Sequence, residues 1–295
     1  MPNFSCLIPA HNAEATIRQC VESALVDFDE VIVYADGCTD RTVAICQSIA
    51  QNNPKGQNFR VINKDAGNGS GQPVGDQVAR NILWKEAKGD YVTWLDSDDF
   101  RIVNTAYRQA SQLQVAQANG KKCIASIGHF VRYYKEPYPN LDIYRDIPDS
   151  LDGGFWELFI DRRIQVGAIL WDARLLRELQ SKEDVGVLWD VNRKRLKEYW
   201  LVTKALLHGF EFDVLNEHVT FYRQGWNEGQ LSNLCNHAVL YYNTERVLSK
   251  YSTPLIPPEK LDYFKERSEG IERMYQKLIR DQQGMKIKRK SLAVD

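Results

Sequence analysis

The sequence predicts an α/β fold in which a mainly parallel sheet is flanked by helices. Through the first hundred residues, short apolar runs typical of buried strands alternate with segments that carry apolar residues at helical spacing. Acidic residues follow the ends of two of these strands, where sheets of this kind bind ligands. The chain has 38 Lys and Arg against 39 Asp and Glu, a balance that argues against a surface built for nucleic acid.

The first hundred residues are predicted to form strand and helix in regular alternation. Apolar runs indicate the strands, and apolar residues three or four positions apart indicate the helices. We expect strands at 4–9, 30–34, 59–62 and 91–95, helices at 13–25, 39–50 and 76–87, and a glycine-rich loop at 67–75.

The rest of the chain is less regular. We expect strands at 122–132, 211–215 and 219–223, an aromatic loop at 133–152, and helices at 103–119, 154–161, 174–182, 194–208, 235–250 and 258–282. No apolar run approaches the roughly 18 residues of a membrane-spanning helix, and no signal peptide is evident. The six cysteines form no C-x-x-C pair, which favours free thiols. These observations predict a cytoplasmic protein.

Three carboxylates lie within four residues at the end of the predicted strand 91–95. Asp96, Asp98 and Asp99 would repel one another unless a cation lay among them, and hard divalent ions such as Mn²⁺ and Mg²⁺ prefer oxygen ligands. The alternative is an acidic turn that only caps the next helix. The position at the edge of the sheet favours a site for a metal ion and a diphosphate.

Three further motifs carry polar residues that fit a nucleotide, although each has an ordinary structural explanation. Asp36 follows the second strand and can accept from a base or ribose, or simply cap the next helix. His11, after the strand that ends at Pro9, can stack on a planar ring, but a single histidine is more often structural. Arg80 can present its planar fork to phosphate or to a base carbonyl, or form a surface ion pair.

Taken in order, the four motifs resemble those of family 2 glycosyltransferases with the GT-A fold. The matching segments are Leu7-Ile8-Pro9-Ala10-His11-Asn12, Ala35-Asp36-Gly37-Cys38-Thr39-Asp40, Ala79-Arg80-Asn81 and Leu95-Asp96-Ser97-Asp98-Asp99. The resemblance covers residues 4–100 and implies a metal-dependent, inverting transfer from a nucleotide-sugar. UDP is the nucleotide expected from its frequency in the family. The chain departs from the pattern at His11, which replaces a Tyr, at Ala35, which replaces an Asp, and in the longer loop 67–75.

The resemblance also implies roles for single residues. The nucleotide-sugar would contact Pro9, Ala10, His11, Asp36, Arg80, Asp96 and Ser97, and Asp98 with Asp96 would hold Mn²⁺ or Mg²⁺. Counting back from the Gly209-Phe210 turn places the catalytic base at Glu198, where the family has the Asp of a Glu-Asp pair. Lys197 replaces the Glu of that pair, Asp190 is the alternative base, and Arg223 is a weaker candidate for a phosphate contact.

The resemblance divides the chain by function. Residues 1–100 would bind the nucleotide-sugar, residues 101–225 would be the acceptor-binding and catalytic half of the same domain, and residues 226–295 would form a helical extension. The acceptor would be a hydroxyl of a glycan, a lipid-linked molecule or another compound. The basic run at 286–290 predicts a frayed tail with at most a peripheral contact to an anionic membrane.

Three competing functions remain. Because Ala35 and Lys197 break two motifs, the chain could bind a nucleotide-sugar without catalysis. An NAD-dependent oxidoreductase is disfavoured, because Gln72 stands where the third glycine of the loop should be and the loop follows the third strand. A nucleotidyltransferase would need a glycine-rich basic loop near the N-terminus, where residues 9–18 offer only Arg18.

Overall fold

The computed structural model describes most of the first 224 residues. The described ranges are 2–53, 58–63, 72–134, 140–143, 164–192 and 197–224, with a few single positions between 258 and 273. The predicted helices at 154–161 and 235–250 and the basic tail lie outside the described residues, as does the rest of the predicted extension apart from those single positions. Among the residues that are described, no helix combines the length and the apolar character needed to cross a membrane.

A nine-stranded sheet forms the centre of the described structure. Its strands are β1 (Phe4–Ala10), β2 (Glu30–Ala35), β3 (Phe59–Asn63), β4 (Tyr91–Trp94), β5 (Phe100–Arg101), β6 (Cys123–Tyr134), β7 (Asn140–Ile143), β8 (Ile169–Asp172) and β9 (Glu211–Gln224). The order is β3-β2-β1-β4-β8-β6-β9-β5, and β7 pairs with β6. The strands β1 to β4 are parallel, β8 is antiparallel to both β4 and β6, and β9 is parallel to β6. The α/β architecture is therefore confirmed, but the sheet is mixed, because four pairings of the described strands are parallel and four are antiparallel.

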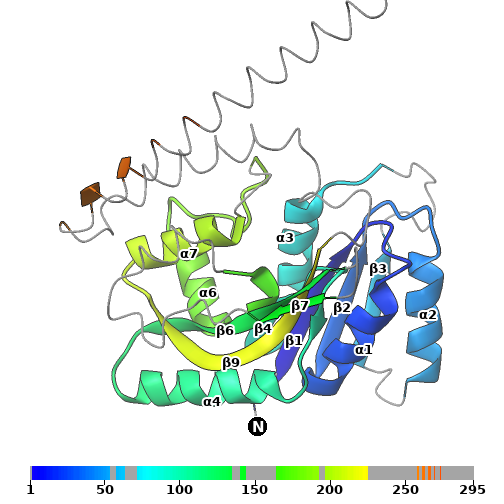
Figure 1. Ribbon diagram of the computed structural model, residues 1–295, viewed down its shortest axis with the longest axis horizontal. Helices are drawn as coiled ribbons and strands as arrows, with labels where there is room; N and C mark the ends of the chain where they lie inside the picture. The colour runs from blue at the N-terminus through cyan, green and yellow to red at the C-terminus, as the bar shows by residue number, and fades with distance from the viewer. Residues whose placement is uncertain are drawn as a thin grey trace, which may run out of the picture.

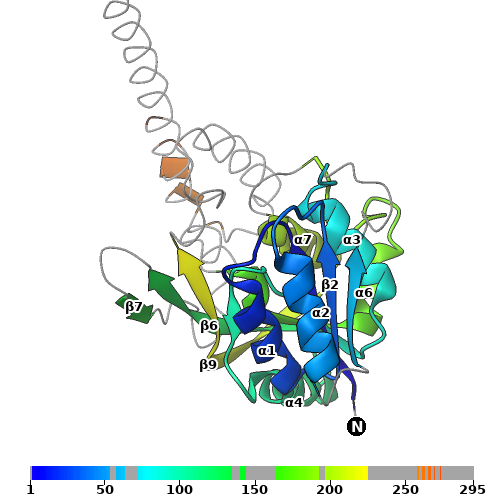
Figure 2. The same cartoon turned by 90° about the vertical axis from the view of Figure 1, so that its right-hand side faces the viewer.

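Helices cover both faces of this sheet. The described helices are α1 (Ile17–Asp27), α2 (Thr42–Asn52), α3 (Asp76–Glu86), α4 (Thr105–Ala118), α6 (Ala173–Gln180) and α7 (Lys197–Leu207), with the short 3₁₀ helix η2 (Val166–Ala168). Apolar residues of α1, α2 and α4 pack on one face, and those of α3, α6 and α7 pack on the other. Figure 2 shows this layering, with α1 and α2 on one side of β2 and α3 and α6 on the other. In Figure 1, α4 runs beneath β9.

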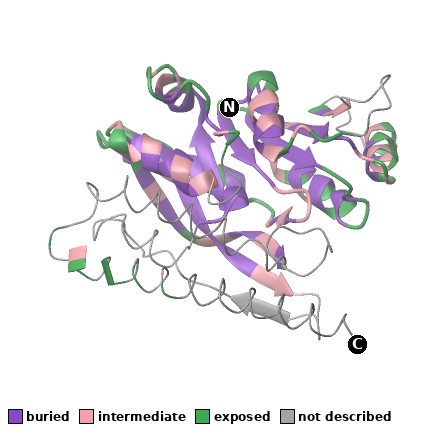
Figure 3. Cartoon of the chain, turned by 90° about the horizontal axis from the view of Figure 1, so that it is seen from above, coloured by how far each residue is buried: buried purple, intermediate pink, exposed green. Residues whose placement is uncertain are grey.

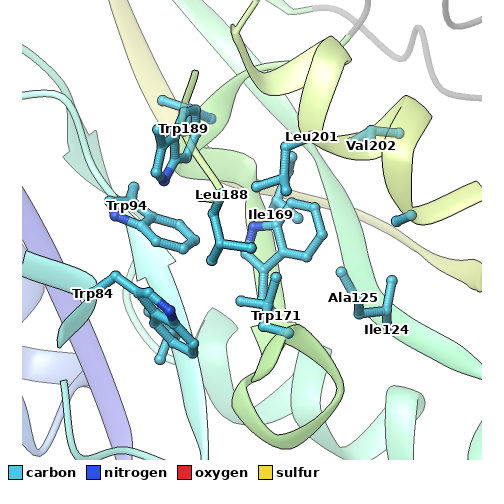
Figure 4. Close-up of a cluster of buried hydrophobic side chains, with 14 of the residues drawn as sticks. Trp84, Trp94, Ile124, Ala125, Ile169, Trp171, Leu188, Trp189, Leu201 and Val202 are labelled. Atoms are coloured by element: carbon cyan, nitrogen blue, oxygen red, sulfur yellow. The ribbon is translucent and has the colours of Figure 1, made fainter. Parts of the chain in front are cut away.

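Strands β1, β2, β4 and β8 are buried almost throughout, and purple marks the buried residues in Figure 3. The core under α3, α6 and α7 is rich in tryptophan (Figure 4), and Trp94 packs edge-on against Trp189 with ring centres 5.1 Å apart. Trp171 and Trp189 are both only 1% exposed. These two tryptophans of the predicted acceptor half therefore stabilise the fold by burial of their rings.

The second half differs from the sequence-based expectation in its strands. The polar residues Asn216 and Glu217 separate two apolar runs and indicate a turn, yet the structure has one continuous strand, β9. A shift in register opposite Gly128 and His129 accommodates the extra residues as a bulge. The predicted loop 133–152 contains β7, and β5 and β8 were not expected, since neither has more than four residues of its own.

The sheet also crosses the predicted functional boundary at residue 100. Strand β4 pairs directly with β8, so the two halves share one set of hydrogen-bonded strands. The assignment of donor binding to the first half and of acceptor binding to the second stays a prediction.

Candidate active site

The loops after β1, β2 and β4 meet at one edge of the sheet, as expected for parallel strands. The backbone N–H of Asp36 donates to the carbonyl of Ala10 at 2.8 Å, which joins the first two loops. Thr16 Oγ1, just before α1, donates to the carbonyl of Ser97 at 3.0 Å, which joins the first loop to the third. Segments separated by up to 81 residues in the sequence are thus held together by main-chain oxygens.

The third of these loops carries the acidic corner, which we define as Asp96, Asp98 and Asp99. Each carboxylate offers an oxygen, and the three oxygens lie within 4.8 Å of one another. Asp99 is fully buried and accepts from the backbone N–H of Arg223 at 2.9 Å and from Gln165 Nε2 at 2.6 Å. Burial, reinforced by the nearby Asp98 and Asp96 charges, raises the pKa of Asp99 well above its ordinary value. Asp96 and Asp98 remain partly exposed.

This arrangement fits a hard divalent cation. Oxygen atoms clustered at this spacing are the ligands that Mn²⁺ and Mg²⁺ prefer. Because both oxygens of Asp99 accept hydrogen bonds from the protein, Asp98 and Asp96 are the residues suited to hold the ion. Gln165, which sequence analysis did not identify, acts here by fixing Asp99. No motif in the sequence marks Gln165, because its contact with Asp99 joins residues 66 positions apart.

Arg80 faces the acidic corner from α3. Its side chain is only 2% exposed and donates to the Asp96 carboxylate. Its Nε lies 3.5 Å from Oδ2 of Asp76, one helical turn earlier, and its guanidinium lies 4.8 Å above the ring of Trp189. Arg80 is therefore a buried cation between two carboxylates. A contact from Arg80 to the nucleotide stays a prediction.

The neighbouring Asn81 clamps a distant segment to α3. Its side-chain NH₂ donates to the carbonyl of Trp189 at 2.7 Å, and its side-chain oxygen accepts from the N–H of Trp189 at 3.1 Å. These two bonds hold the chain ahead of α7, and they position the ring of Trp189 against Arg80. The motif Ala79-Arg80-Asn81 thus organises both the acidic corner and the approach to α7.

Asp36 occupies the predicted place after β2 but already has two backbone partners. Its carboxylate oxygens accept from the N–H of Val74 at 2.7 Å and of Gly75 at 2.8 Å, at the end of the loop that precedes α3. Gly75 has φ of +95°, a conformation that favours glycine. Asp36 is 4% exposed. It anchors this loop, and its predicted contact with the nucleoside would have to share or replace these bonds.

The segment after β1 lies beside Asp36. Pro9 and Ala10 are buried, and His11 is exposed. The Nδ1 of His11 donates to the carbonyl of Asp36 at 2.6 Å, which orients the imidazole at the edge where the loops meet. The structure therefore brings the predicted nucleotide contacts together at one edge, while their contact with a ligand stays a prediction.

The first turn of α7 brings Glu198 to the same site. Burial raises the pKa of Glu198, reinforced by the charge of Asp96 and opposed by those of Lys197 and Arg80. Lys197 ion-pairs with Asp76 of α3. Burial lowers the pKa of Lys197 to about 8. The sequence could not indicate this pair, because the two residues are 121 positions apart.

The two reserve candidates have structural partners. The carboxylate of Asp190, the alternative base, accepts from the N–H of Asn192 at 3.0 Å, the local bond of an Asx turn. Arg223 donates to the carbonyl of Asp98 at 2.7 Å and to the side chain of Gln19. Arg223 thus supports the backbone of the acidic corner, and its contact with a phosphate stays a prediction.

Comparison with known proteins gives one family. Residues 5–146 match the model of "Glycosyl transferase family 2". Glycosyltransferase GlyA of Streptococcus pneumoniae is 26% identical over 262 residues, which are 83% of this chain and 34% of that protein. The hyaluronan synthase of Pasteurella multocida is 38% identical over 104 residues, 34% of this chain and 10% of that enzyme. The chain thus spans about a third or less of the length of these relatives.

Solved structures share the fold. TarS 1–349 of S. aureus in complex with UDP-GlcNAc superposes with a TM-score of 0.63 and 16% identity, over 91% of this chain and 71% of that one. The mannosyltransferase PcManGT of Pyrobaculum calidifontis, in complex with GDP-Man and Mn²⁺, has a TM-score of 0.59 and 13% identity, over 90% of this chain and 69% of that one. The GT-A fold implied by the motifs is therefore confirmed.

Proposed function

We propose that this chain, whose residues 5–146 match the model of glycosyl transferase family 2, moves a sugar from a nucleoside diphosphate sugar to an acceptor hydroxyl with inversion at the anomeric carbon. The observation that carries the proposal is the acidic corner. Its three carboxylate oxygens lie within 4.8 Å at the edge of the sheet. Glu198 follows Lys197, which pairs with Asp76 beside Arg80. Arg80 pairs with Asp96, so the first turn of α7 is connected to this corner. A metal-binding group and a buried base at one site are the two components that such a transfer requires.

The proposed donor is a UDP-sugar. The fold neighbour TarS is solved with UDP-GlcNAc, and PcManGT with GDP-Man and Mn²⁺, so both bases are represented among proteins of this fold. The nucleoside would lie along Pro9, Ala10, His11 and Asp36, and the ribose and diphosphate would approach Arg80, Asp96 and Ser97.

Asp98 and Asp96 would hold Mn²⁺ or Mg²⁺ in this proposal. When bound, such an ion neutralises charge on the departing diphosphate, which is worth several kcal/mol in the transition state. Arg80 keeps Asp96 oriented through their ion pair. Gln165 and Arg223 hold Asp99 and the backbone of Asp98, so that the loop keeps its shape.

Glu198 is the proposed base. The acceptor oxygen forms a bond to the anomeric carbon as the bond from that carbon to the diphosphate oxygen breaks. The electron pair of the broken bond leaves with the nucleoside diphosphate, and the acceptor proton passes to the Glu198 carboxylate. One displacement inverts the anomeric centre, as in inverting hydrolysis. A positioned base of this kind contributes roughly 10²–10⁴-fold.

The proposed acceptor is a glycan or a lipid-linked molecule, and the proposed setting is cytoplasmic. Support comes from relatives named as hyaluronan and chondroitin synthases, whose names point to polysaccharide synthesis. The acceptor side would be formed by η2 and β8, whose residues Val166 and Gly167 follow Gln165 and thus lie close to the acidic corner.

A thermal-shift panel tests donor and metal together. UDP-, GDP-, CDP- and dTDP-sugars are each measured with and without Mn²⁺, and we expect stabilisation by a UDP-sugar that depends on Mn²⁺. Release of nucleoside diphosphate is then followed for native protein and for Glu198→Gln. We expect the variant to bind the donor normally and to lose turnover. Retained turnover in Glu198→Gln would contradict the base assignment.

A second candidate is a nucleotide-sugar-binding protein without catalysis. Two observations favour it: Ala35 stands where the family has an acid, and Lys197 replaces the acid beside the base. In that case the panel would show Mn²⁺-dependent stabilisation, but native protein would release no nucleoside diphosphate, even by hydrolysis of the donor.

A further inference from the structure

The lysine that breaks the family's acid pair has a defined partner. Lys197, only 15% exposed, forms an ion pair with Asp76 in the first turn of α3. Asp76 is also 3.5 Å from Nε of Arg80, and Arg80 pairs with Asp96. These four residues form a chain of alternating charges that runs from α7 through α3 to the acidic corner. We call this set the ion-pair chain.

Asp76 is shared between two cations. Arg80 has a side chain that is 2% exposed, and its Nε and one terminal NH₂ group make no hydrogen bond within the described structure. A buried guanidinium depends on nearby carboxylates, since an uncompensated charge in the interior is strongly destabilising. Loss of Asp76 would leave Arg80 with Asp96 as its ion-pair partner and would remove the partner of Lys197.

Helix geometry connects Lys197 to the direction of Glu198. Adjacent residues on an α-helix point roughly 100° apart, so fixing the side chain of one fixes the rotation of the turn. The same turn is held on another side by Tyr199, whose hydroxyl accepts from the N–H of Ile164 at 3.0 Å. Glu198 lies between these two anchors in the sequence. The two anchors therefore fix the backbone from which the Glu198 side chain extends.

We propose that Lys197 is a positioning residue for glycosyl transfer. Through its ion pair with Asp76, it orients Glu198 toward the acceptor. The same ion pair holds Asp76 where its carboxylate, together with that of Asp96, compensates the charge of Arg80. This inference rests on the proposed function, because Lys197 acts on the reaction only through the base. Under this proposal, Lys197 supports catalysis by Glu198. Without it, the replacement of the family's Glu by Lys197 would suggest that catalysis has been lost.

Kinetics of Lys197→Met, Asp76→Asn and the double variant test this role. The probe is UDP-N-acetylglucosamine with Mn²⁺, and release of UDP is measured. We expect Lys197→Met to lower kcat at least 30-fold while the donor KM changes less than threefold. Asp76→Asn should lower kcat at least as much, because it also removes one of the two carboxylates beside Arg80. The double variant should lose far less than the product of the two single losses, because the residues act as a unit.

A matched control uses an ion pair at the other end of the sheet. Lys122, which precedes β6, pairs with Glu178 at 2.8 Å, and both side chains are well exposed. Lys122→Met should leave kcat and KM within twofold of native. A kcat for Lys197→Met within threefold of native would overturn the proposal. Equal losses of kcat and of donor-dependent thermal stabilisation would overturn it too, since they indicate general damage.

Hydrogen exchange gives a readout that needs no turnover. In Lys197→Met the amides of Leu201 and Val202, in the next turn of α7, should exchange at least tenfold faster, while that of Leu113 in α4 should not change. Unchanged exchange at Leu201 and Val202 would overturn the anchoring role. If native protein releases no UDP from any donor, the proposed function fails, and the exchange result still decides whether Lys197 anchors α7.

Discussion

Two aspartates at equivalent places in the sheet have different environments. Asp36 follows β2, is 4% exposed, and has both carboxylate oxygens bonded to the backbone of Val74 and Gly75. Asp96 follows β4, and its side chain is 36% exposed with Arg80 as its partner. The same residue type at the same edge therefore anchors the backbone in one loop and is left partly exposed beside Arg80 in the other. Exposure, together with the identity of the partners, distinguishes a structural carboxylate from a candidate ligand.

The largest effect on metal binding and turnover should come from Asp98, in the loop after β4. Asp98→Ala removes a proposed metal ligand, so we expect Mn²⁺-dependent stabilisation by a UDP-sugar to disappear and turnover to fall by two orders of magnitude or more. Unfolding of the protein without ligand should change little, because Asp98 is partly exposed. The thermal-shift panel and release of UDP measure both quantities. Full Mn²⁺ dependence in this variant would show that Asp98 is not a ligand.

The opposite pattern is expected at Asp36, which is buried. Asp36→Ala removes the charged acceptor of the N–H groups of Val74 and Gly75, and a hydrogen bond to a charged group contributes about 1.5–3 kcal/mol. We therefore expect a loss of about 2–4 kcal/mol in the free energy of unfolding without ligand, measured in urea. Mn²⁺ binding should persist in this variant. Native-like stability would show that Asp36 does not anchor the loop.

The acidic side of the pH profile should reflect the buried base. Burial raises the pKa of Glu198 above its ordinary value, against the opposing charges of Lys197 and Arg80 and reinforced by Asp96. A base must be ionised to accept a proton, so kcat should fall as the pH drops through this raised pKa. The limb should therefore lie at higher pH than for an ordinary glutamate. A pH series of kcat checks this, and a flat profile from pH 4 to 7 would contradict it.

The smallest effect should follow removal of the exposed ring beside Asp36. His11→Ala loses one hydrogen bond to the Asp36 carbonyl, so we expect about 1 kcal/mol of destabilisation and no change in Mn²⁺ dependence. If the ring stacks on the base, donor affinity should also fall several-fold. Titration with a UDP-sugar tests this, and unchanged affinity would remove His11 from the nucleotide contacts.

The sequence motifs predicted which residues lie at the edge of the sheet better than they predicted the hydrogen-bond partners of those residues. Asp36 and Asp96 follow parallel strands and lie at the edge where the strand-end rule places them, and Arg80 reaches Asp96 from α3. The bonds from Asp36 to the backbone and from Asn81 to Trp189 were not foreseen. A residue's position within a motif does not say which backbone groups will pack beside it.

The sequence by itself determined the alternation of strands and helices up to β4. The spacing of apolar residues indicates each element, because burial of one face imposes a local repeat on the chain. The sequence also determined that carboxylates would gather at one edge. Tertiary structure alone decided that β8 inserts antiparallel between β4 and β6, and that Lys197 meets Asp76 across 121 residues. These contacts join segments with no common local pattern, so they form only when the whole sheet and the helices on its faces pack together.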